Sequence, residues 1–214
     1  MKRCIGILCP LVMIFLFTSF ELDTHQATRS QVPASLRIQD SLGAHLPQPP
    51  QPLSASLVSP PFVGTGYIGF REALAFKESG GDYFTTNTLG YLGKYQFGIG
   101  TLQLIGVYNA TQFLQTPELQ EKAFAGNLAR NKWILRREIP RFVGHHVKGV
   151  EITESGILAA AHLAGAGNVK KYLYSSGSMD VVDAYGTSIT QYLRKFRGYD
   201  TSGIQPIKNP RVLL

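Results

Sequence analysis

Side chains that would face a protein core recur at helical spacing along the chain after residue 62. Phe70, Leu74 and Glu78 follow one another at intervals of four residues, so they share one face of a helix. Gly80 and Gly81 predict where this helix ends, because glycine is the usual residue just beyond a helix C terminus. The pattern therefore predicts a first helix that stops shortly after Glu78.

The clearest helix start in the rest of the chain is at Thr116, a candidate N-cap that is followed by Pro117 and by an acidic residue. The predicted helix runs from there to about Arg137, and Pro140 closes it. Its buried side is marked by three apolar residues: Phe124, Leu128 and Leu135. Further helices are predicted over residues 99–107, 154–163, 168–174 and 188–197.

Residues 83–97 have a different pattern from the helical segments. They are rich in threonine, tyrosine, phenylalanine and glycine, and Asn87 and Gly90 are typical turn residues. We expect a short hairpin or an irregular β-lobe in this segment. The predicted fold class is therefore mainly α, a helical bundle with a small β-hairpin lobe after its first helix.

Proline divides the chain into two parts, since eight of the twelve prolines fall before residue 62. Residues 1–20 start with Lys2 and Arg3 and continue as an uncharged apolar run, which predicts a secretory signal peptide or, alternatively, an uncleaved N-terminal anchor. Residues 21–61 are rich in proline, glutamine and serine and are predicted to be a disordered linker. We expect the folded domain over residues 62–207, a tail over 208–214, and export to the periplasm or the cell exterior.

The chain carries 21 lysines and arginines against 14 acidic residues, a net charge of +7. Such a balance favours a polyanionic partner, which could be a nucleic acid, an anionic membrane or an acidic cell-wall polymer. The export signal, the scattered positions of the basic residues and the lack of a nucleic-acid-binding motif argue against nucleic acid. Membrane contact is expected only through the anchor alternative.

Glu78 is the most informative polar residue of the folded part. It shares the core-facing side of its helix with Phe70 and Leu74, and it lies at the negative C-terminal end of that helix. Both features disfavour the charged carboxylate, and a protonated carboxyl group is what a general acid in glycosidic cleavage needs. The alternative interpretation is an ordinary last-turn glutamate that bends out to solvent.

Four segments carry a resemblance to a known family. They read ESGGDY at 78–83, GYLGKYQFG at 90–98, AAHLAGAGNVKKY at 160–172 and TQYL at 190–193. In this order they resemble the motifs of lytic transglycosylases of the soluble-lytic-transglycosylase type, members of the lysozyme superfamily. The sequence departs from the family where His162 and Leu163 replace its common Tyr-Asn, and where Ser188 and Ile189 replace its Glu-Thr. These departures affect the expected substrate contacts more than the chemistry.

The resemblance implies a lysozyme-like α+β domain over residues 62–207 and a catalytic role for Glu78. Glu78 would protonate the oxygen between N-acetylmuramic acid and N-acetylglucosamine and then accept the proton of the muramoyl C6 hydroxyl, giving a 1,6-anhydro product. The implied substrate-binding residues are Ser79, Tyr91, Tyr95, Gln96, Phe97, His162, Gly165 and Tyr192. For the aromatic residues, Gln96 and His162, a structural role in the core or in a turn remains open.

The resemblance implies peptidoglycan glycan strands as the partner and no cofactor, and we expect no metal site. A lysozyme-type hydrolase is the first alternative; it would need a second carboxylate across the sugar, and Asp82 is the nearest candidate in sequence. Asp82 follows two glycines and is also interpreted as a turn aspartate. The second alternative is a non-catalytic peptidoglycan-binding module on the same fold.

Overall fold

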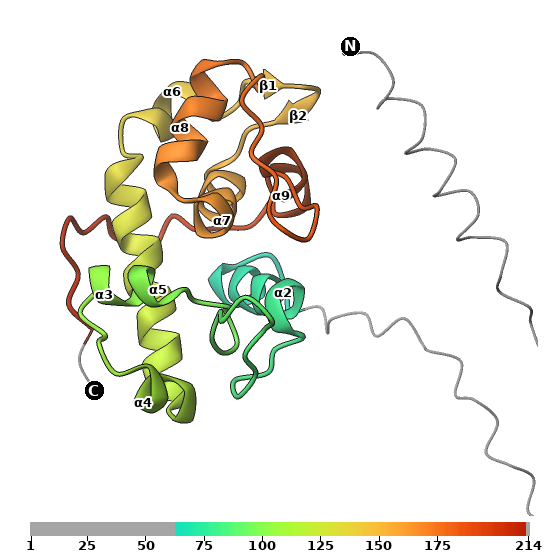
Figure 1. The fold of residues 1–214 in the computed structure, drawn as a ribbon. Helices are drawn as coiled ribbons and strands as arrows, with labels where there is room; N and C mark the ends of the chain where they lie inside the picture. Colours follow the sequence, from blue (N-terminus) through green and yellow to red (C-terminus); the bar gives the residue numbers. More distant parts are fainter. Residues whose placement is uncertain (1–62, 213–214) are drawn as a thin grey trace, which may run out of the picture. The chain divides into compact units, whose positions relative to one another are not determined.

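The computed structural model describes residues 63–212, and the predicted signal peptide and linker lie outside the described residues. About half of the described residues are helical (Figure 1). The mainly α prediction is therefore confirmed. The elements in chain order are α2 (Tyr67–Ser79), α3 (Ile99–Leu104), α4 (Ala110–Gln115), α5 (Pro117–Ile134), α6 (Glu138–Phe142), β1 (His146–Val147), β2 (Val150–Glu151), α7 (Glu154–Ala164), α8 (Ala166–Tyr174) and α9 (Ile189–Lys195).

The long helix α5 runs through the middle of the described part, with α7, α8 and α9 gathered beside its C-terminal end and α2 alongside it (Figure 1). Its buried side carries Phe124 and Leu128, as predicted. Phe124 lies 6.5 Å from the ring of Phe70 in α2 and stacks at 4.1 Å on Tyr95. Phe196, just after α9, meets Phe70 edge-on at 6.2 Å. This aromatic cluster joins the first and last helices through α5.

The end of α5 differs from the prediction. The helix stops at Ile134, and Pro140 lies inside the following short helix α6 rather than closing α5. Proline fits there because Pro140 occupies the first turn of α6, where backbone N–H groups have no partner within the helix. Helix α4 was not predicted either; its N-cap, Asn109, accepts a hydrogen bond from the backbone N–H of Gln112.

Of the two expectations for residues 83–97, the structure agrees with the irregular β-lobe and not with the short hairpin. The two-stranded antiparallel sheet of the described residues pairs β1 with β2, with Val147 opposite Val150. Lys148 and Gly149 between them both have positive φ, as a tight two-residue hairpin turn requires. Residues 83–97 instead form an irregular loop that contains only isolated bridges, such as Leu92 to Phe97.

The domain continues beyond the predicted boundary at 207. Val212 is buried, and its N–H donates to the carbonyl of Ile105 at 2.9 Å. Residues 207–212 run along α5, where Gly126 leaves room for them, since a Cβ at this position would meet Val212 at 2.9 Å. The predicted tail is thus part of the packed domain as far as the structure describes it.

Within residues 63–212, no helix combines the length and the apolar character that crossing a bilayer requires.

Candidate functional site

Glu78 lies in the last turn of α2, which Gly80 ends in the left-handed conformation with φ 71°. One of its carboxylate oxygens, Oε1, accepts a hydrogen bond of 2.6 Å from the hydroxyl of Tyr192 in α9. The other oxygen, Oε2, takes part in no hydrogen bond or ion pair with the residues that the structure describes. Glu78 therefore has one oxygen fixed by Tyr192 and one without a partner in the described part of the chain.

Tyr192 remains a proton donor to Glu78. Its pKa is raised far above the ordinary value, first because the phenol is buried and then because the Glu78 carboxylate lies beside it. The phenol therefore stays neutral at physiological pH and keeps its proton pointed at Oε1. The hydrogen bond joins two residues that are 114 positions apart in the chain.

Glu78 and Tyr192 open on a cavity of about 580 Å³. A second cavity of about 360 Å³ adjoins it. The two cavities share five lining residues and therefore form one continuous groove, which we call the groove. The shared residues are Tyr91, Gln96, His162, Leu163 and Ala164.

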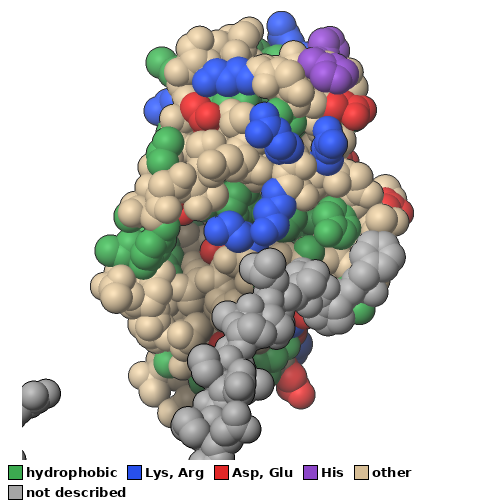
Figure 2. Space-filling view, turned by 90° about the vertical axis from the view of Figure 1, so that its right-hand side faces the viewer, with side chains coloured by type: hydrophobic (Ala, Val, Ile, Leu, Met, Phe, Trp, Pro, Cys, Tyr) green, Lys and Arg blue, Asp and Glu red, His purple; other side chains and the backbone are tan. Residues whose placement is uncertain are grey.

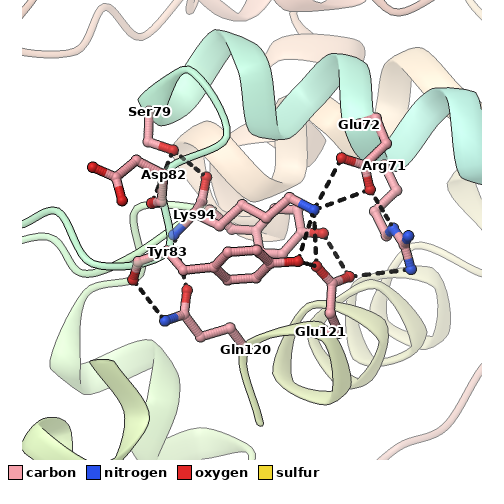
Figure 3. A network of polar contacts seen from close by, with 9 residues as sticks. Arg71, Glu72, Ser79, Asp82, Tyr83, Lys94, Gln120 and Glu121 are labelled. Carbon is pink, nitrogen blue, oxygen red and sulfur yellow. Dashed lines mark hydrogen bonds and ion pairs between the residues drawn. The ribbon is translucent and has the colours of Figure 1, made fainter. Parts of the chain in front are cut away.

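The loop that carries Tyr91 and Gln96 is fastened to the end of α2. The hydroxyl of Ser79 donates to the carbonyl of Lys94 at 2.8 Å, and the Lys94 N–H donates to the side chain of Gln120 at 2.8 Å. The Lys94 ammonium is buried between the carboxylates of Glu72 and Glu121, at 2.9 Å from each (Figure 3). The backbone and the side chain of one lysine thus fix the loop against α2 and α5.

Glu121 is the acceptor at the centre of this network. Burial alone would raise its pKa, but hydrogen bonds from Tyr83, Lys94 and Tyr95 outweigh burial and hold the pKa below its ordinary value. Tyr83 and Tyr95 donate to the two oxygens of Glu121 at 2.6 and 2.7 Å. Burial would lower the pKa of Lys94, but hydrogen bonds with Glu121, Glu72 and Tyr83 outweigh it and keep the pKa above its ordinary value. We call Glu72, Tyr83, Lys94, Tyr95 and Glu121 the lysine network.

The structure places three of the predicted substrate-binding side chains at the centre of the groove. Tyr91 is 43% exposed and lines both cavities. Gln96 adopts φ 49° and its amide donates to the Gly93 carbonyl at 3.0 Å. His162 donates through Nε2 to the Tyr95 carbonyl at 2.8 Å, so its Nδ1 accepts from Asn127 at 3.3 Å. Both ring nitrogens are thus used by neighbouring groups, which fixes the orientation of the imidazole.

The other predicted residues divide between the groove and the core. Phe97 and Gly165 line the second cavity, although Phe97 is only 2% exposed. Tyr95 does not line the groove, which corrects the prediction: its ring is stacked on Phe124 and its hydroxyl belongs to the lysine network. Ser79 does not line the groove either, because its hydroxyl is used by the Lys94 carbonyl.

Asp82 is a turn residue, in agreement with its structural interpretation. Its Oδ1 accepts from the N–H of Phe84 at 2.8 Å, and the side chain lines neither cavity. A different carboxylate, Asp183, lines the groove together with Glu78. Asp183 Oδ1 accepts from the N–H groups of Tyr185 and Thr187, and its charge helps to raise the pKa of Tyr192. Sequence reasoning missed this residue because nothing in the loop 180–188 marks it as facing Glu78.

Two further features of the groove were missed. The Tyr185 hydroxyl forms a hydrogen bond of 3.1 Å with Thr88, which joins the loop 180–188 to the loop that follows α2. Helix α5 contributes Asn127 and Asn131, both 5% exposed. The sequence does indicate this feature, because two asparagines lie four residues apart on the side of the helix that also carries apolar residues.

Two lysines lie near Glu78. Lys77 lines the groove, and Lys195 in α9 lies close enough that burial and the charge of Lys77 lower its pKa, with Glu78 opposing the shift. Figure 2 looks from the side of α2, α9 and the hairpin and shows several lysine and arginine side chains on this face.

Comparisons of the chain with models of protein families, with curated proteins and with solved structures found no match. Among residues 63–212, no group of three or more histidine, cysteine, aspartate or glutamate side chains could hold a metal ion. Carboxyl, phenol and amide groups are among the polar side chains that line the groove.

Proposed function

We propose that this protein is an exported, lysozyme-like lytic transglycosylase that cleaves peptidoglycan glycan strands with Glu78 as general acid and base. The observation that carries the proposal is the position of Glu78. It lies in the last turn of a helix, lines a groove together with tyrosine and glutamine side chains, and is held through one oxygen by Tyr192. The remaining oxygen can exchange a proton with the substrate.

The proposed reaction needs one carboxyl group. Protonated Glu78 donates its proton to the glycosidic oxygen, and that bond to muramoyl C1 breaks. The carboxylate then accepts the proton of the muramoyl C6 hydroxyl while its oxygen bonds to C1, which closes the 1,6-anhydro ring. Tyr192 supports the carboxylate stage, because a neutral phenol donates to Oε1 throughout.

Side chains along the groove suit a polymer of sugars that carry acetamido groups. The Gln96 amide and the exposed ring of Tyr91 offer hydrogen bonding and stacking to sugar rings. Tyr185 adds a second aromatic side chain at the Glu78 end. The basic charge of the chain favours a wall polymer that bears free carboxylates.

The test is to incubate the full chain with isolated peptidoglycan and to weigh the released fragments. Wild-type protein should release fragments lighter by one water than hydrolytic fragments, and Glu78→Gln should release none. Glu151→Gln is the matched control, since Glu151 is an exposed residue of β2 outside the groove. Binding of the wall without any release by wild type would contradict the proposal and favour a non-catalytic binding module.

Asp183 gives a specific reason to keep a hydrolase as the second candidate. A retaining or inverting glycosidase uses two carboxyl groups about 5 to 10 Å apart across the scissile bond. Asp183 lines the same cavity as Glu78. Asp183→Asn separates the two functions, because asparagine can still accept the loop's hydrogen bonds: a transglycosylase should retain most of its activity, and a hydrolase releasing hydrated fragments should lose it.

A further inference from the structure

Helix α5 presents a polar face to the part of the groove away from Glu78. Asn127, Arg130 and Asn131 are three and four residues apart, so they lie on one side of the helix. All three line the second cavity of about 360 Å³. One cationic and two amide side chains therefore line this cavity, and they would bind a polar group better than an apolar one.

The Asn131 side chain opens on the second cavity. It is 5% exposed, and its side chain has no hydrogen-bond partner among residues 63–212. Asn127, in contrast, donates to His162. Among residues 63–212, the fully buried side-chain atom without a hydrogen bond is Glu138 Oε2, so the Asn131 amide keeps contact with the cavity and can be reached by a molecule that enters the groove.

Arg130 is half-buried and also has no partner in the described part of the chain. Two lysines that are largely buried do have partners: Lys94 pairs with Glu72 and Glu121, and Lys132 pairs with Glu154 at 2.8 Å. A guanidinium presents a planar array of donors that matches a carboxylate in a two-point contact. Arg130 therefore lines the groove as a cation without a counter-ion.

We propose that Arg130 and Asn131 form a subsite for a carboxylate on the substrate. This inference rests on the proposed function, because peptidoglycan carries carboxylates on the muramoyl side of its strand, whereas the sugar rings and their acetamido groups are neutral. The carboxylate comes either from the peptide stem or, in strands without peptides, from the lactyl group. The subsite would select charged wall strands over neutral polymers of N-acetylglucosamine.

Binding to the full chain in the Glu78→Gln background tests the subsite without cleavage. The probes are soluble peptide-bearing glycan fragments, the same fragments with their carboxylates converted to amides, and peptide-free fragments that keep the lactyl carboxylate. Arg130→Gln should weaken binding of the peptide-bearing fragments about tenfold, in line with the loss of a charged hydrogen bond. It should leave binding of the amidated fragments unchanged, and Arg130→Lys should recover part of the loss.

Arg197→Gln serves as the matched control, because Arg197 is exposed and lies outside the groove. A loss confined to peptide-bearing fragments would assign the carboxylate to the stem, and a loss shared with peptide-free fragments would assign it to the lactyl group. Equal weakening of charged and amidated fragments by Arg130→Gln, or no weakening of either, would overturn the subsite. The proposed function fails separately, if wild type releases no anhydro fragments.

Discussion

The hydroxyl of Tyr192 donates a hydrogen bond of 2.6 Å to Oε1 of Glu78, across 114 positions of sequence. The contact joins the last turn of α2 to the middle of α9, and both residues line the groove. A buried phenol with a strongly raised pKa can serve there only as a donor. Glu78 is thereby held in one orientation, with Oε2 unpartnered among residues 63–212.

Replacing Tyr192 with phenylalanine removes this donor and keeps the aromatic ring. We expect the rate of fragment release from peptidoglycan to fall by about tenfold or more, since a hydrogen bond to a charged group contributes about 1.5–3 kcal/mol. The free energy of unfolding should change less, because Glu78 is only partly buried and water can replace the phenol. An unchanged rate for Tyr192→Phe would show that the contact does not support catalysis.

Lys94→Met should destabilise the fold markedly. The substitution leaves Glu72 and Glu121 without the ammonium that lies 2.9 Å from each. We expect the free energy of unfolding to fall by about 2–4 kcal/mol, somewhat less than for fully buried pairs because both carboxylates are partly exposed. Urea unfolding measures the change, and Lys171→Met, at an exposed position of α8, should stay within about 0.5 kcal/mol of wild type.

Glu121 should make the free energy of unfolding depend on pH. Its pKa in the folded protein is lowered by hydrogen bonds from Tyr83, Lys94 and Tyr95, which outweigh burial. A lowered folded pKa means that the unfolded chain binds the proton more readily, so the contribution is present above the unfolded pKa and is lost as the pH falls through the folded pKa. Unfolding free energies should therefore decline below about pH 4.5. In Glu121→Gln this decline should be shallower, and an equally steep decline would count against the assignment.

Val212 should contribute to stability although it lies close to the C terminus. Its side chain is 8% exposed and packs beside Gly126 of α5. Val212→Ser should lower the free energy of unfolding by about 1–2 kcal/mol, because burial of a valine is worth about 1.5–3 kcal/mol. Val143→Ser at an exposed position is the control, and a similar small effect for both variants would mean that the terminal segment does not pack in solution.

The helices could be predicted because their signals are local. The four-residue spacing of Phe70 and Leu74 and the glycine after Ser79 were enough to define α2 and its end. The break between α5 and α6 could not be predicted in this way, since a proline fits the first turn of a helix as well as it ends one. The sequence could not decide between a hairpin and an irregular β-lobe at 83–97, because Lys94 and Tyr95 are held by side chains of α2 and α5 rather than by a neighbouring strand.

The same distinction applies to the site. Glu78 and Tyr192 could be proposed from motifs, because each lies on a helix whose register the sequence defines. Tyr95 was assigned to the groove because sequence spacing does not tell which side of an irregular loop faces the core. Asp183 and Arg130 reach the groove only through tertiary packing, and neither has a local signal that distinguishes it from a solvent-exposed charge.

The most direct test of the central claim is the mass of the fragments that the full chain releases from isolated peptidoglycan. Wild-type protein should yield fragments that are lighter by one water than hydrolytic products, and Glu78→Gln should yield none under the same conditions. Release by Glu78→Gln at the wild-type rate would contradict the role of Glu78. Hydrated fragments from wild type would contradict the anhydro-forming reaction and assign the chemistry to Glu78 together with Asp183.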